Sequence, residues 1–94
     1  MTYAKKVDLN HTEIVKTFRD LGATVFDASG IGRGFPDIVL GYNNITCLVE
    51  IKSCEKKKFT EAQLKFMSEW KGSSVVRIND VGGAIRLIKL LDLQ

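Results

Sequence analysis

The 94-residue sequence has few of the residues that define several protein classes. It contains one proline and two cysteines, and it shows neither an internal repeat nor a low-complexity stretch. Cys47 and Cys54 are seven residues apart and His11 is far from both, which does not match the spacing of a zinc site. These absences argue against a zinc site, a solenoid and a disordered tail. We expect free thiols in a reducing compartment.

Long apolar runs are also missing. No stretch approaches the ~18 consecutive apolar residues that a membrane-spanning helix needs. The segment MTYAKKVDLN contains two lysines but no apolar run after them, unlike a secretory signal. We therefore expect a cytoplasmic protein with no membrane partner.

The excess of positive charge is small. The formal net charge is +3 and the pI is about 9.0. This charge is compatible with a polyanionic partner but does not require one. A histone-like protein would carry a much denser set of lysines and arginines.

The chain has the length of one small domain, which we place at residues 1–94. The spacing of its apolar residues predicts helices over 11–21, 60–71 and 80–91, and strands over 23–27, 37–42, 45–52 and 74–78. The order α-β-β-β-α-β-α predicts an α/β (α+β) fold in which helices flank a central mixed sheet.

Capping signals mark the predicted helix ends. Asn10 is expected to cap the first helix and Gly22 to end it. Thr60 and Gln63 form a T-x-x-Q capping box, and Asn79 or Asp80 is expected to cap the last helix. Gly72 is expected to end the second helix. The apolar side chains expected on the inner faces of the helices are Ile14, Val15, Phe18, Leu21, Phe66, Met67, Trp70, Ile85, Ile88 and Leu91.

A tight hairpin is predicted between the second and third strands. Asn43 and Asn44 separate them, and asparagine tolerates the positive φ of a two-residue turn. Asp37 and Glu50 are both six residues from this turn, so they are expected directly opposite each other, ~5 Å apart at Cβ. Lys52 follows Glu50 by two residues and therefore shares its face of the sheet.

Two carboxylates this close destabilise a sheet unless something neutralises them. Lys52 supplies part of that charge, and Mg²⁺ or Mn²⁺ supplies more, since Mg²⁺ typically binds one or two carboxylates together with waters and phosphate oxygens. A metal bound there polarises a phosphodiester, and a lysine beside it positions the attacking water or stabilises the charge on phosphorus. The parts suffice to hydrolyse a nucleic-acid backbone. The alternative is a surface salt-bridge cluster at the end of the sheet.

Pro36-Asp37, followed by Glu50-Ile51-Lys52, resembles the PD-(D/E)xK nuclease signature. The wider segment GFPDIVLGYNNITCLVEIKSCEKKKFTEAQLKFMSEW looks like the VRR-NUC (virus-type replication-repair nuclease) branch in its stand-alone form. The resemblance covers residues 10–90 and implies a restriction-endonuclease-like core.

The resemblance also implies roles for the motif residues. The carboxylates of Asp37 and Glu50 would bind the metal, and the backbone carbonyl of Ile51 would be a further ligand. Lys52 would orient the attacking water.

Two residues outside the motif are catalytic candidates on the same resemblance. Glu13 matches an auxiliary metal ligand on the first helix, and Gln63 matches a helical glutamine near the metal or the substrate phosphate. The alternatives are structural: Glu13 complements the helix dipole, and Gln63 serves only the capping box. The two roles of Gln63 can coexist.

Basic residues flank the motif in loops. Arg33, Gly34, Lys56, Lys57 and Lys58 are candidates for nucleic-acid binding, and the alternative is a solvated charge run. Phe66 and Trp70 are expected in the core or at a dimer interface, in preference to an exposed stacking platform for single strands.

Stand-alone members of this size resemble Holliday-junction resolvases that act as homodimers. The resemblance therefore implies a Mg²⁺- or Mn²⁺-dependent endonuclease that cuts branched DNA in a bacterial or phage-infected cell. One alternative is a non-catalytic nucleic-acid-binding module that keeps the fold. Another is a regulatory or interaction protein with no nucleic-acid role.

Overall fold

The structure, a computed structural model, describes residues 8–94. Residues 1–7, which fall in the segment where the sequence predicts no secretory signal, lie outside the described residues. The elements are, in chain order, α1 (His11–Asp20), β1 (Thr24–Asp27), β2 (Ile38–Tyr42), β3 (Ile45–Ile51), α2 (Glu61–Glu69), β4 (Val76–Ile78) and α3 (Val81–Asp92). The predicted order of elements is confirmed.

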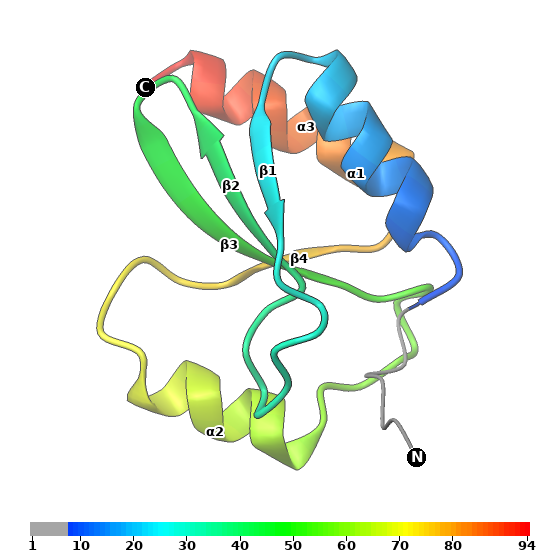
Figure 1. The fold of residues 1–94 in the computed structure, drawn as a ribbon, viewed down its shortest axis with the longest axis vertical. Helices are drawn as coiled ribbons and strands as arrows, with labels where there is room; N and C mark the ends of the chain where they lie inside the picture. The colour runs from blue at the N-terminus through cyan, green and yellow to red at the C-terminus, as the bar shows by residue number, and fades with distance from the viewer. Residues whose placement is uncertain (1–7) are drawn as a thin grey trace.

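The four strands form one mixed sheet in the order β1-β2-β3-β4. β1, β2 and β3 pair antiparallel, whereas β4 pairs parallel to β3 because the chain crosses over through α2 between them. α1 and α3 lie side by side, and α2 lies on the opposite side of the molecule from them (Figure 1). The predicted α+β class with a mixed sheet is confirmed.

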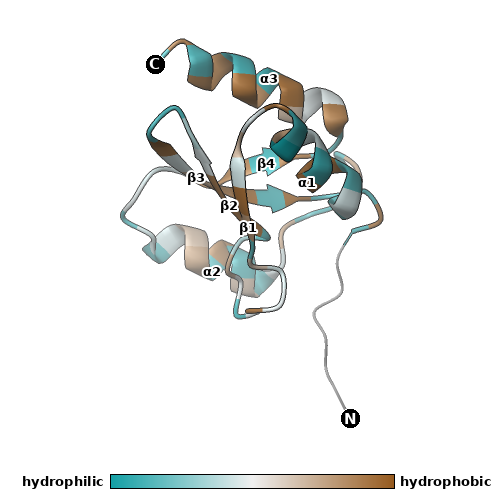
Figure 2. Cartoon of the chain, turned by 45° about the horizontal axis from the view of Figure 1, so that its top comes forward, coloured by the Kyte–Doolittle hydropathy of each residue, from teal (hydrophilic) through white to brown (hydrophobic). Residues whose placement is uncertain are grey.

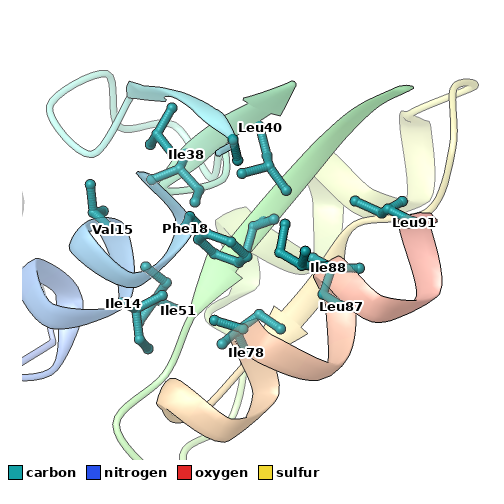
Figure 3. Close-up of a cluster of buried hydrophobic side chains, with 14 residues drawn as sticks. Ile14, Val15, Phe18, Ile38, Leu40, Ile51, Ile78, Leu87, Ile88 and Leu91 are labelled. Carbon is teal, nitrogen blue, oxygen red and sulfur yellow. The ribbon is translucent and has the colours of Figure 1, made fainter. Parts of the chain in front are cut away.

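The hydrophobic core lies between the sheet and the pair α1 and α3 (Figure 3). Phe18 and Ile14 of α1 and Ile38, Leu40 and Ile51 of the sheet are fully buried. Apolar residues gather on the strands and on α3 (Figure 2). Each such side chain contributes roughly 1.5–3 kcal/mol by leaving water, so this half of the molecule holds the fold together.

The predicted hairpin register is confirmed. Asn43 and Asn44 have φ of 52° and 62°, the values that a type I′ turn requires at both central positions. Ile38 pairs with Val49 and Tyr42 with Ile45, as the two-residue turn predicts. The same register brings Asp37, one residue before β2, to the end of the hairpin where Glu50 lies.

Helix boundaries follow the capping signals in most places. Gly22 has φ of 96°, and its N–H and that of Ala23 bond back to the carbonyls of Arg19 and Phe18, which satisfies the end of α1. The Asp80 side chain accepts the N–H of Gly83 and caps α3. The side chain of Asn10 does not cap α1, contrary to the prediction. Its amide donates instead to the carbonyls of Lys52 and Asn79.

Several predicted inward positions are wrong. Leu21 is 40% exposed and Ile85 is 37% exposed, whereas Ala84 and Leu87 of α3 are buried. The helical period turns Ile85 away from the sheet once Ala84, Ile88 and Leu91 face it.

α2 is shorter than predicted and contributes no residue to the hydrophobic core. It ends at Glu69 because the backbone of Trp70 is already extended, and the N–H of Trp70 donates the last helical hydrogen bond to the carbonyl of Phe66. Gln63 is its one buried side chain, and the predicted core residue Trp70 is 42% exposed. Among the described residues, no helix is long and apolar enough to cross a membrane.

Candidate nuclease site

A cavity of about 460 Å³ opens where the start of β2 and the end of β3 meet the start of α2. The four predicted residues Asp37, Glu50, Lys52 and Gln63 all line it. Each is buried, with 3–6% of its surface exposed. Buried ion pairs are weak contributors to stability because desolvation offsets their attraction. Charges collected at a cavity wall are therefore better explained by a function than by stability.

Asp37 is held from two directions. Its backbone carbonyl accepts the N–H of Ala28 at 2.8 Å, which ties it to the end of β1. Its carboxylate oxygen Oδ2 accepts the backbone N–H of Ile51 at 2.8 Å, which ties it to β3. The preceding Pro36 is fully buried. The carboxylate therefore has a fixed position at the cavity wall.

Glu50 lies on β3, which is paired on both sides, with β2 and with β4. A strand with two neighbours is the most rigid part of a sheet, so its backbone position is well fixed. Its Oε2 accepts a hydrogen bond from Nε2 of Gln63 at 2.8 Å. This bond orients the carboxylate toward α2.

Lys52 is on the same face as Glu50, as the alternation of a strand predicts. Its Nζ donates to Oε1 of Gln63 at 2.8 Å and lies 3.7 Å from Oε2 of Glu50. It also lies 5.7 Å from the ring centroid of Phe59, which is a favourable place for a cation. The ammonium group is thus held at the cavity, away from bulk solvent.

Gln63 joins the lysine, the glutamate and the helix start. Its Oε1 accepts from Lys52 and from the backbone N–H of Thr60, and its Nε2 donates to Glu50. The Thr60 hydroxyl in turn accepts the N–H of Gln63 at 3.2 Å. The predicted capping box is confirmed, and the same side chain also serves the site. The capping role is therefore shown, and the contacts with Lys52 and Glu50 place the same side chain at the cavity, where its role toward a metal or phosphate stays a prediction.

The residues predicted to bind nucleic acid divide into two groups. Arg33, Gly34, Lys57 and Lys58 line the cavity, whereas Lys56 is exposed and does not. Arg33 has φ of 58° and Gly34 has φ of 79°. A Cβ on Gly34 would lie 2.1 Å from the carbonyl oxygen of Ala62, so only glycine allows this loop to touch α2.

Glu13 is not brought to the site. It is exposed on α1 and does not line the cavity, because the inner side of that helix is occupied by Ile14, Val15 and Phe18. A helix turns about 100° per residue, so the residue before Ile14 points away from the sheet. The helix-dipole explanation agrees with this position, since Glu13 lies in the first turn.

Asp8 is an acid at the cavity that sequence reasoning missed. It lines the cavity and pairs with Nζ of Lys57 at 2.5 Å. Burial alone would raise its pKa, but hydrogen bonds from Lys57 and Ser53 lower it below its usual value. No local pattern marks this residue, because its partner is 49 residues away in sequence.

His11 and Asp27 form a second polar contact that the sequence did not reveal. Nε2 of His11 lies 3.1 Å from Oδ2 of Asp27 and ties the start of α1 to the end of β1. Burial raises the pKa of Asp27, but bonds from the hydroxyl and N–H of Ser29 and from His11 lower it to about 2. This pair supports the end of β1 that positions Asp37.

The donor set fits a hard divalent cation. Asp37 and Glu50 present carboxylate oxygens at the wall of a cavity, and Mg²⁺ commonly takes one or two carboxylates and completes its shell with waters and phosphate oxygens. Within residues 8–94 there is no cluster of three or more histidine, cysteine or acidic side chains that could hold a metal without such partners. The carbonyl of Ile51 stays a predicted ligand, and the N–H of the same residue is bonded to Asp37.

Comparison with known proteins adds no identification. No family model matches the chain, and no curated protein or solved structure matches it either.

Proposed function

We propose that this protein is a Mg²⁺- or Mn²⁺-dependent endonuclease of the VRR-NUC type, with a restriction-endonuclease-like core. The observation that carries the proposal is the convergence of Asp37, Glu50 and Lys52 at one cavity, with Gln63 bonded to both Glu50 and Lys52. These residues come from a loop, a strand and a helix. Asp37 lies at the start of β2, Glu50 and Lys52 lie at the end of β3, and polar groups that converge on one cavity in this way are typical of an active site.

Asp37 and Glu50 would hold the metal through carboxylate oxygens. A bound divalent cation polarises the phosphodiester and lowers the pKa of a coordinated water. The side chains of the protein would orient the water and the phosphate. Because Gln63 fixes Nζ of Lys52 at 2.8 Å, the ammonium group is preorganised to orient a water or to stabilise negative charge on a phosphate.

The rim of the cavity suits a phosphodiester backbone. Arg33, Lys57 and Lys58 line it together with the buried Lys52, so four cationic side chains surround the two central carboxylates. Phosphate contacts of this kind provide affinity without reading sequence. This supports a substrate recognised by its backbone and shape, in agreement with a preference for branched DNA.

Asp8 competes with phosphate for Lys57. Its carboxylate pairs with Lys57 at the rim, and a substrate phosphate could replace it. The Lys57 side chain is 51% exposed and Asp8 only 11%, but Ser53 also donates to the Asp8 carboxylate, so this carboxylate keeps a partner when Lys57 turns to a phosphate. A homodimer, as in stand-alone members of the family that the sequence resembles, remains part of the proposal.

The test is cleavage of labelled linear, flapped and four-way DNAs in Mg²⁺ or Mn²⁺. Wild type is compared with Asp37→Ala, Lys52→Ala and the control Lys71→Ala, which changes an exposed lysine that does not line the cavity. We expect cutting by wild type and Lys71→Ala, and a loss of about 100-fold or more in the two site variants. If wild type cuts none of the DNAs, or if both site variants cut as fast, the enzyme proposal is wrong.

The alternative binding module makes a different prediction. Its DNA affinity would not depend on a divalent metal or on the two carboxylates. A wild-type protein that binds branched DNA equally well in EDTA and in Mg²⁺ without cutting it would favour this alternative.

A further inference from the structure

Three aromatic rings form a row that leads away from the cavity along α2. Phe35 meets Phe66 edge to face, with ring centroids 5.3 Å apart and an interplanar angle of 72°. Phe66 stacks on Trp70 at 5.3 Å with an interplanar angle of 20°. We call Phe35, Phe66 and Trp70 the aromatic row.

The aromatic row begins at the candidate site. Phe35 precedes Asp37 by two residues, and Phe66 follows Gln63 by three residues on the same helix. The contact of Gly34 with the backbone of Ala62 keeps this loop against α2. A strand bound at the site therefore has the row as its neighbour.

The row is not part of the core: Phe35 and Phe66 are half-buried, and Trp70 is exposed. Trp70 is 42% exposed and Leu64, on the same helix, is 53% exposed. Gln63 is the only buried residue of α2. An apolar surface of this kind next to a candidate site suggests a ligand with apolar faces.

The indole of Trp70 is held in place by Phe66, which stacks on it, and by Gly72, which lies close to it, while 42% of the residue stays exposed. Its Nε1–H donates to the carbonyl of Ser73 at 3.0 Å, so the indole has no donor left for a ligand. A Cβ on Gly72 would lie 2.7–2.9 Å from indole atoms, so glycine lets the chain pass close to the ring. A fixed ring whose N–H is already bonded can stack on a base but cannot read its hydrogen-bonding edge.

Cationic side chains flank the row. The charged residues that line a second hollow of about 210 Å³ beside Phe66 are Arg33, Lys65 and Glu69, two cations and one anion, and Arg33 also lines the larger cavity. Within residues 8–94, no carboxylate pairs with Arg33. Lys65 has only an exposed partner, Glu69, at 3.9 Å. Positive charge beside stacked rings is the combination that single-stranded nucleic acid binds.

We propose that the aromatic row is a stacking platform for unpaired nucleobases of the DNA strand that enters the site, with Arg33 and Lys65 contacting its phosphates. This inference rests on the proposed function and sharpens its substrate. It predicts that the protein prefers branched DNA that carries a single-stranded arm. The platform tolerates any base sequence, because every base has a face that stacks on an aromatic ring.

The first measurement uses the intrinsic fluorescence of Trp70, the single tryptophan of the chain. Wild-type protein in EDTA, where no metal-dependent cutting occurs, is titrated with an oligothymidylate and with a fully paired hairpin. We expect the oligothymidylate to quench Trp70 and the hairpin to leave its emission nearly unchanged. Equal quenching by both, or by neither, overturns the proposal.

The second measurement is the anisotropy of a labelled oligothymidylate with variants. Trp70→Ala should bind about fivefold to a hundredfold more weakly, the range that loss of one stacked base gives. Trp70→Phe, which keeps a ring, should bind within a few-fold of wild type. The control Leu90→Ala removes an apolar side chain that is 59% exposed on α3 and should change nothing. Far-UV circular dichroism confirms that each variant is folded.

The outcomes separate this inference from the proposed function. If wild type cuts DNA but Trp70→Ala binds the oligothymidylate as tightly as wild type, the platform is wrong and the nuclease stands. If Trp70 is quenched but no DNA is cut, the platform stands as a binding site and the nuclease fails. If sedimentation shows that Trp70→Ala splits a wild-type dimer, a second copy covers the row and the proposal is overturned.

Discussion

Gln63 is the residue on which the geometry of the site depends most. One side-chain amide bonds to Lys52, to Glu50 and to the backbone at the start of α2. It therefore couples the position of a helix to the positions of two charged groups on the sheet. A glutamine suits this place because it offers a donor and an acceptor on one planar group.

Gln63→Ala should reduce DNA cleavage by roughly 10- to 100-fold, because Lys52 and Glu50 lose their common partner. The matched control is Thr60→Ala, which removes the capping hydroxyl but leaves the Gln63 amide in place. Both variants should lose about 1 kcal/mol of stability, measured by urea unfolding. Equal cleavage by the two variants would show that Gln63 acts only as a capping residue.

Asp27 should make the free energy of unfolding vary with pH in the acid range. Because its pKa falls from 3.8 unfolded to about 2 folded, its contribution is present above pH 3.8 and is lost as the pH falls toward 2. Urea unfolding should show Asp27→Asn less stable than wild type at pH 6, with the gap closing near pH 2. The carboxylate is nearly half exposed, so the gap should be below about 1 kcal/mol. A gap that does not change with pH would contradict this.

At the scale of elements, the loop before β2 determines how α2 meets the sheet. Gly34 packs against the first turn of α2 at a distance that excludes any side chain. The same loop carries Arg33, Phe35 and Asp37. The loop and α2 therefore form one unit, and the cavity lies between them and the sheet.

Gly34→Ala should lower cleavage by at least about tenfold while most of the fold survives, because α2 must move away from the loop and Gln63 moves with it. Gly32→Ala shares the positive φ but has no neighbour within 4 Å, so it isolates backbone strain. Gly30→Ala has neither feature and should behave as wild type. If Gly34→Ala cleaves DNA as fast as Gly30→Ala, the loop does not position the site.

Most elements and the central hairpin could be predicted from the sequence, because both depend on local patterns. Asn43 and Asn44 set the turn, and the alternation of a strand then puts Glu50 and Lys52 on one face. Glu13 and Asp8 could not be placed this way. The first depends on which side of α1 packs on the sheet, and the second pairs with Lys57 across 49 residues. The exposure of Trp70 also depends on tertiary structure. The helical spacing of Phe66, Met67 and Trp70 cannot show whether another element packs on them.

At the scale of the whole molecule, the hydrophobic core and the candidate site occupy different halves. The apolar core lies between the sheet and the pair α1 and α3 (Figure 3), while α2 is attached through the cavity residues and the aromatic contacts. The sheet is the shared wall of both halves. Changes on the α2 side should therefore affect activity more than the free energy of unfolding.

A metal held by two buried carboxylates should stabilise the whole fold. At about ten times its dissociation constant, Mn²⁺ should add roughly 1.4 kcal/mol and raise the Tm by several degrees. Differential scanning fluorimetry of the double variant Asp37→Asn, Glu50→Gln should show no such rise. A rise of the same size in the double variant would mean that the metal binds elsewhere.

The most direct test of the central claim is the cleavage rate of one labelled branched DNA in saturating Mg²⁺, compared between wild type and Glu50→Gln. The substitution keeps the size of the side chain and removes its charge. We expect wild type to cut in Mg²⁺ and not in EDTA, and Glu50→Gln to be slower by about 100-fold or more. Cutting by Glu50→Gln at nearly the wild-type rate, or cutting that continues in EDTA, would contradict a metal-dependent nuclease site at Asp37, Glu50 and Lys52.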